Sequence, residues 1–268
     1  MAIATEAFIQ QTRRVNVVKT STGPKPTSMK NKLPIEINKA DIRLLLGLSL
    51  FSIFSITLLA GRMYATGYLT FKFLVWNLFL AWMPLGFAAA ANRVHGIAKR
   101  PWLALGFAAG WLLFFPNAPY ILTDLFHLRP RGIPYWFDLL LILSFAVNGL
   151  LLGLASLFEI HSWLNRHYKA WIGWAVIGTA LIAGGYGIYL GRYLRWNSWD
   201  IIKEPVALLQ DTLRPLLHPF DNKETIAMTL GFAAFMGLCY LVLRNFGKDP
   251  YRKEEQYPVS KANGQAST

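Results

Sequence analysis

Ionisable side chains gather in a few short segments of an otherwise apolar chain. Asp124 and His127 are three residues apart, a spacing that places both side chains on one face of a helix. An aspartate beside a histidine can work as an acid–base pair or contribute to a divalent-metal site. Zinc usually needs three or more protein ligands, so Asp138 and Asp200 would have to converge on the pair. A metal site and a simple hydrogen-bonded pair both stay open.

A second charged segment carries two arginines. Arg192 and Arg195 are also three residues apart and would repel each other on a shared helical face, so they require an anion. Asp124, Asp138 and Asp200 are candidate anions within the chain. Lipid phosphates are candidates outside it, because guanidinium groups bind them through two parallel hydrogen bonds. Arginine beside Trp and Tyr at the end of a span is equally typical of an interface anchor.

Two asparagines complete the candidate binding set. Asn197 follows the two arginines, and Asn117 lies between Pro116 and Pro119. Each proline lacks an amide hydrogen and disfavours helical geometry in the residue before it, so a helix should kink or open there. Asn117 can then bond a carbonyl left without its usual partner. Open backbone at membrane depth is tolerated mainly where it is packed in protein or lines a cavity.

Six apolar stretches must position these segments. Each has about the length that a helix needs to cross a bilayer, and none contains Asp, Glu, Lys or Arg. Backbone groups in hydrocarbon must bond internally, so each stretch should be helical. The stretches are Leu44–Gly61, Phe73–Ala91, Trp102–Leu122, Leu139–Phe158, Trp171–Gly191 and Thr225–Leu243. The predicted fold is an all-α bundle of six transmembrane helices within residues 42–244.

The charge distribution predicts an orientation. The chain has 27 basic and 14 acidic residues, a net charge of +13. With both termini in the cytoplasm, the inner segments hold 18 of the Lys and Arg residues and the outer segments hold 9, as the positive-inside rule requires. Topology thus accounts for the positive charge without a nucleic-acid partner. We expect a multi-pass protein of the plasma membrane, with membrane lipids as partners and the charged segments facing outward.

The segments outside the spans have separate interpretations. Residues 1–41 and 245–268 are polar and predicted to be disordered cytoplasmic tails. Glu204–Leu217, between the fifth and sixth spans, has apolar residues on one stripe of a helix, which could lie in the outer headgroup plane or pack over the bundle. Polar residues at the inner side are interpreted as solvated loop residues; they are Asn92, Arg93, His95, Glu159, His161 and His167.

The two outer charged segments resemble a known family. Residues 114–128, FFPNAPYILTDLFHL, and residues 191–200, GRYLRWNSWD, are similar to motifs of the bacterial membrane family called domain of unknown function 1361. The resemblance runs from about Leu44 to Leu243. It implies a bacterial polytopic membrane protein and names no activity.

The leading functional hypothesis is recognition of an anionic, phosphate-bearing lipid or lipid-linked head group. Arg192 and Arg195 would clamp the phosphate. Asp124 and His127 would serve as an acid–base pair or as metal ligands, and Asp138 and Asp200 would orient them. A transporter is the second hypothesis, although the spans contain no carboxylate of the kind that proton relays use. A non-catalytic scaffold is the third, and it predicts closed ion pairs such as Arg192 with Asp124 and no open cleft. Spacing alone shows no complete catalytic set.

Overall fold

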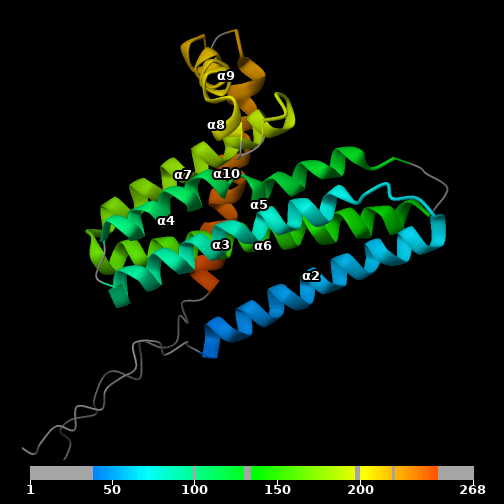
Figure 1. Cartoon of the computed structure of the whole chain (residues 1–268), viewed down its shortest axis with the longest axis horizontal. Coiled ribbons are helices and arrows are strands. Elements are labelled where there is room, and N and C mark those ends of the chain that lie inside the picture. Colours follow the sequence, from blue (N-terminus) through cyan, green and yellow to red (C-terminus); the bar gives the residue numbers. More distant parts are fainter. Residues whose placement is uncertain (1–38, 99–100, 130–133, 197–199, 219–220, 247–268) are drawn as a thin grey trace, which may run out of the picture. The chain divides into compact units, whose positions relative to one another are not determined.

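The computed structural model describes residues 39–98, 101–129, 134–196, 200–218 and 221–246 (Figure 1). Every element in these ranges is a helix. The elements are α2 (Lys39–Thr66), α3 (Phe73–Ala98), α4 (Pro101–Phe114), α5 (Asn117–Tyr120), the 3-10 helix η1 (Ile121–His127), α6 (Tyr135–His167), α7 (Ala170–Arg192), α8 (Asp200–Lys203), α9 (Pro205–Leu217) and α10 (Lys223–Phe246). Most of the two predicted tails lies outside the described residues.

Six helical segments of the described chain are long and apolar enough to cross a membrane. They contain all six predicted spans and extend beyond them, so the prediction of an all-α bundle with six spans is confirmed. Large apolar side chains such as Leu50, Ile53 and Leu238 are more than half exposed on these helices, as expected for surfaces that face lipid. The protein is therefore a multi-pass membrane protein.

Helix α6 lies at the centre of the bundle. Two thirds of its apolar window, 67%, is buried, against 22–39% in the other five spans. It contacts α2, α3, α5, η1 and α7, and Figure 1 shows α3, α4 and α6 side by side. Phe145 and Leu152 on α6 are fully buried. Most of the other elements therefore pack against this helix.

The third span is interrupted, as the two prolines predict. Helix α4 ends at Phe114 and α5 begins at Asn117, because Pro116 has no amide hydrogen to continue the helix. The Asn117 Nδ2 donates a hydrogen bond to the Phe114 carbonyl oxygen at 2.9 Å. The break is therefore closed by the asparagine side chain, and the chain continues into η1.

Glycines on both neighbouring helices hold α5 in place. On α7, a Cβ added at Gly187 would lie 2.5 Å from Pro116 Cγ, and one at Gly191 would lie 3.2 Å from Tyr120 Cε2. On α6, a Cβ added at Gly149 would lie 2.6 Å from the Ala118 carbonyl oxygen. The approaches at Gly187 and Gly149 leave no room for a Cβ unless the neighbouring atoms shift, and the approach at Gly191 is tight. The α5 segment is therefore packed closely between α6 and α7.

Candidate functional site

The centre of the site is a buried carboxylate. Asp124 on η1 is 1% exposed. Its Oδ2 accepts a hydrogen bond from Asn77 Nδ2 on α3 at 2.9 Å, and its Oδ1 lies 3.4 Å from Arg192 Nη1 at the end of α7. A buried charge is costly unless it is paired and hydrogen-bonded. Three elements distant in sequence therefore converge on this one side chain.

His127 and Arg192 also border the carboxylate, and both of these side chains are partly exposed. His127 Nδ1 lies 3.8 Å from Asp124 Oδ1, so the predicted pairing at three-residue spacing occurs, here within a 3-10 helix, where such side chains are eclipsed. Arg192 Nη2 lies 3.3 Å from His127 Nδ1. Since a guanidinium only donates, the Nδ1 atom accepts in this contact. The Arg192 Cζ also stands 5.4 Å from the centre of the Phe126 ring.

The described residues offer no third metal ligand beside Asp124 and His127. Asp124 and His127 are two potential ligands, but the described residues contain no group of three or more His, Cys, Asp or Glu side chains that could hold a metal ion. Structural and catalytic zinc sites use at least three protein ligands. What the geometry assembles is a hydrogen-bonded ionic cluster, which can hold a charged group in place.

Asp138, expected beside the arginines of the fifth span, binds Arg62 on α2. Arg62 Nε lies 2.6 Å from Asp138 Oδ1 and Arg62 Nη2 lies 3.2 Å from Oδ2, with both side chains buried. Sequence reasoning ended the first span at Gly61 and assigned Arg62 to an outer loop. Helix α2 instead continues to Thr66, which carries Arg62 into the bundle. The position of Arg62 directly after an apolar span, in register with its helix, was the sequence feature that could have indicated this longer helix.

The segment after α7 differs from its helical prediction. Helix α7 ends at Arg192, and Arg195 is exposed with φ of 59°. The two arginines are therefore not on one helical face, because the chain turns between them. Asp200 is the first residue of α8. Asn197 lies outside the described residues.

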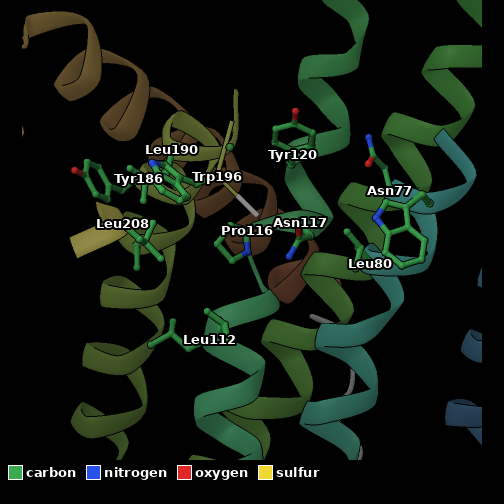
Figure 2. Close-up of a pocket in the computed structure, with 15 residues that line it drawn as sticks. Asn77, Leu80, Leu112, Pro116, Asn117, Tyr120, Tyr186, Leu190, Trp196 and Leu208 are labelled. Carbon is green, nitrogen blue, oxygen red and sulfur yellow. The ribbon is translucent and has the colours of Figure 1, made fainter. Parts of the chain in front are cut away.

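Beside the ionic cluster lies a cavity of about 300 Å³, and Figure 2 shows the residues that line it. Its wall comes from α3, α4, α5, α7 and α9, together with Trp196 after α7. Apolar lining residues include Leu112, Leu190 and Leu208. The lining residues with a polar side-chain atom are Trp76, Asn77, Asn117, Tyr120, Tyr186 and Trp196. Asn77 both lines the cavity and bonds Asp124, so one side chain links the apolar space to the charged cluster.

Two hydrogen bonds attach α9 beside this cavity. Trp196 Nε1 donates to Asp211 Oδ2 at 3.0 Å, and Tyr186 Oη donates to the Thr212 carbonyl oxygen at 2.6 Å. The opposite surface of α9 leaves Val206 and Leu209 more than half exposed. Whether this exposed face meets the headgroup plane stays a prediction. Tyr186 and Trp196 are site residues that the sequence did not single out, since Trp and Tyr are common at span ends.

A family model described as Protein of unknown function (DUF1361) matches residues 76–239. The chain belongs to this family. No curated protein and no solved structure gave a match. The matched region includes Asp124, Arg192 and the whole lining of the cavity, whereas Arg62 precedes it.

In this DUF1361 protein, the end of α6 differs from its interpretation as a solvated loop. His161, expected to be a solvated loop residue, is 2% exposed. Its Nδ1 contacts Tyr240 Oη and Arg244 Nη1 on α10. Glu159 accepts a hydrogen bond from Asn92. Helix α6 continues to His167, so the expected loop is helical and these side chains pack against neighbouring helices.

Proposed function

We propose that this DUF1361 protein binds an anionic, phosphate-bearing lipid or lipid-linked head group at the outer leaflet of the plasma membrane. The observation that carries the proposal is the cavity of about 300 Å³ that shares Asn77 with the buried Asp124 cluster. Ligand sites are typically concave and mostly apolar, with a few fixed polar groups. An apolar chain would occupy the cavity, and the phosphate would lie at Arg192.

Arg192 is suited to receive a phosphate. Its contacts with Asp124 and His127 are 3.4 Å and 3.3 Å long, whereas charge-assisted bonds from arginine are usually about 2.7–2.9 Å. The side chain is held near the cluster without short bonds, so a phosphate oxygen can form a better one. Asp124 keeps Arg192 in position while Asn77 satisfies the other carboxylate oxygen. Arg195 and Asn197 follow in sequence and would complete the headgroup contacts.

A scaffold is the second candidate, and one observation favours it. The ion pair between Arg192 and Asp124 is the contact that a scaffold predicts. The adjoining cavity is not expected for a closed scaffold, and this favours binding. For a transporter, the polar groups within the spans already bond neighbouring side chains. Asn148, in the middle of α6, donates a hydrogen bond to Ser52 at 2.8 Å, and the buried carboxylates Asp124 and Asp138 are each paired with an arginine.

The proposal is tested by native mass spectrometry of the purified full-length protein. The lipids are phosphatidic acid, phosphatidylglycerol and a polyprenyl phosphate, with zwitterionic phosphatidylcholine as the reference. Arg192→Gln should weaken binding of the anionic lipids about tenfold or more, since a hydrogen bond to a charged group contributes about 1.5–3 kcal/mol. Arg214→Gln removes an exposed arginine from neighbouring α9 and should leave binding unchanged.

A second pair of variants tests the cavity. Ala183 lines it, whereas Ala175 is exposed on the same helix. Ala183→Phe should fill the space and reduce retention of every lipid chain, and Ala175→Phe should have no effect. The proposal is wrong if Arg192→Gln and Ala183→Phe both fold and bind anionic lipids as the unmodified protein does.

A further inference from the structure

A second cavity, lined by several polar side chains, lies at the other end of the helical bundle from the Asp124 cluster. Its volume is about 290 Å³, and its lining includes His161, Ser162 and Asn165 near the end of α6 and Tyr240 and Arg244 near the end of α10. Trp174, in the first turns of α7, and Arg192 are eighteen residues apart on one helix, about 27 Å at 1.5 Å per residue. The second cavity is thus at the other membrane boundary from the Asp124 cluster.

Arg244 brings a positive charge to this cavity that the described residues do not neutralise. Its Nη1 donates to His161 Nδ1 at 2.8 Å and to Tyr240 Oη at 3.1 Å, and both acceptors are neutral groups. Within the described ranges, the ion pairs join other residues. A guanidinium has five N–H donors, and these contacts use only one nitrogen. No hydrogen bond from Nε or Nη2 is formed among the described residues, and two adjacent guanidinium N–H groups of this kind can bind a phosphate through parallel bonds.

His161 cannot supply the missing negative charge and is fixed as an acceptor. Because its Nδ1 accepts from Arg244, the ring is neutral with its proton on Nε2. That Nε2 atom is buried and has no hydrogen-bond partner among the described residues. The imidazole ring also meets Trp174 edge-on, with 4.8 Å between ring centroids. His161 therefore positions Arg244 without competing for the anion.

The arrangement differs from that of an interface anchor. An anchoring arginine extends its head group into water, but Arg244 folds back so that its Cζ stands 4.6 Å from the centre of the Trp174 ring. Contacts of this kind hold the cation at the cavity wall. Ser162 and Asn165 present a hydroxyl and an amide on the same wall, and these are further donors for phosphate oxygens.

We propose that the Arg244 cavity binds a phosphate group, so that the protein holds phosphate-bearing groups at both membrane boundaries. The phosphate could belong to a lipid of that leaflet or to a small soluble molecule. The full-length protein is tested in detergent by thermal denaturation with glycerol 3-phosphate or with phosphatidic acid in mixed micelles. A ligand that binds only the folded state raises Tm. A shift with glycerol 3-phosphate supports a soluble source, and a shift with phosphatidic acid alone supports a lipid.

The variants separate binding from a structural role. Arg244→Gln should abolish the ligand-induced rise in Tm, whatever its effect on Tm without ligand, and Arg244→Lys should retain only part of it because an ammonium lacks the planar fork. Arg93→Gln removes an exposed arginine of α3 and should keep the full rise. Ser162→Trp obstructs the cavity without removing a residue that bonds Arg244, and it should also abolish the rise.

Measurements in an Arg192→Gln background keep this inference distinct from the proposed function. The Arg244-dependent rise in Tm should persist there, even if Arg192 has no role in lipid binding. The inference is overturned if neither probe raises Tm in that background. It is also overturned if Arg244→Gln and Ser162→Trp show the same ligand-induced rise in Tm as the protein that keeps both residues.

Discussion

Arg62 and Asp138 form a buried ion pair through two hydrogen bonds, at 2.6 Å and 3.2 Å, that joins α2 to α6 across 76 positions of sequence. The Arg62 Cζ also stands 4.6 Å from the centre of the Phe71 ring. Arg62 Nη1 is buried and has no hydrogen-bond partner among the described residues. Asp138 is therefore committed to the attachment of the first span.

The first prediction concerns this pair. Arg62→Met and Asp138→Leu should each lower stability by about 3–5 kcal/mol, because each leaves an unpaired buried charge. The double variant should lose much less than the sum of the two, since no lone charge remains. Thermal unfolding in detergent gives the stability of the unmodified protein, the two single variants and the double variant. Strictly additive losses would show that the two side chains do not interact.

The second prediction concerns the packing of α5 against α7. Gly187→Ala places a methyl group 2.5 Å from Pro116 Cγ, whereas nothing lies within 4 Å of a Cβ added at Gly178 on the same helix. Overpacking should cost Gly187→Ala about 1–3 kcal/mol. Gly178→Ala should be neutral or slightly stabilising, because alanine favours helices. Equal melting temperatures for the two variants would contradict the close approach.

The third prediction concerns the partner of the buried carboxylate. Asn77→Leu leaves Asp124 Oδ2 without its 2.9 Å hydrogen bond and should cost about 1–3 kcal/mol. Asn77→Asp keeps the shape but puts a second carboxylate beside the first, so it should lower the melting temperature further at neutral pH. If Asn77→Asp is as stable as the unmodified protein, Asn77 does not donate to Asp124.

The fourth prediction concerns the attachment of α9. Trp196→Phe and Tyr186→Phe each remove one of the bonds that connect α9 to α7 and its end. Amide hydrogen exchange in Pro205–Leu217 should become faster in both variants, because local opening requires less free energy. Tyr193→Phe changes an exposed tyrosine nearby and is the matched control. Unchanged exchange rates in Trp196→Phe and Tyr186→Phe would show that contacts other than these two hydrogen bonds stabilise α9.

Much of the fold was predictable because membrane spans are encoded locally. All six predicted spans lie within the observed membrane-spanning segments, the third of which is broken between α4 and α5. Helix length and the absence of charge are properties of contiguous residues, so a sequence reveals them directly. The break at Pro116 and the proximity of Asp124 and His127 were predictable for the same reason. Both depend on rules that act over three or four residues.

Most tertiary partners were not predictable in this way, although Asp124 was among the three anions that the sequence offered for Arg192. Asp124 is bonded by Asn77 and Asp138 by Arg62, and no local rule relates residues so far apart. The burial of His161 depends on where α10 places Tyr240 and Arg244. The cavity depends on five helices together. Spacing along one helix predicts the helix face on which a residue lies. The partner that its side chain contacts depends on how whole spans pack together.

The most direct test of lipid binding is photo-crosslinking with an anionic lipid that carries a diazirine on its acyl chain. Labelled residues are located by mass spectrometry of the full-length protein. The account predicts labels on the cavity lining, at positions such as Leu112, Tyr186 and Leu208, and loss of these labels in Ala183→Phe but not in Ala175→Phe. Labels spread over exposed apolar residues, with no decrease in Ala183→Phe, would contradict it.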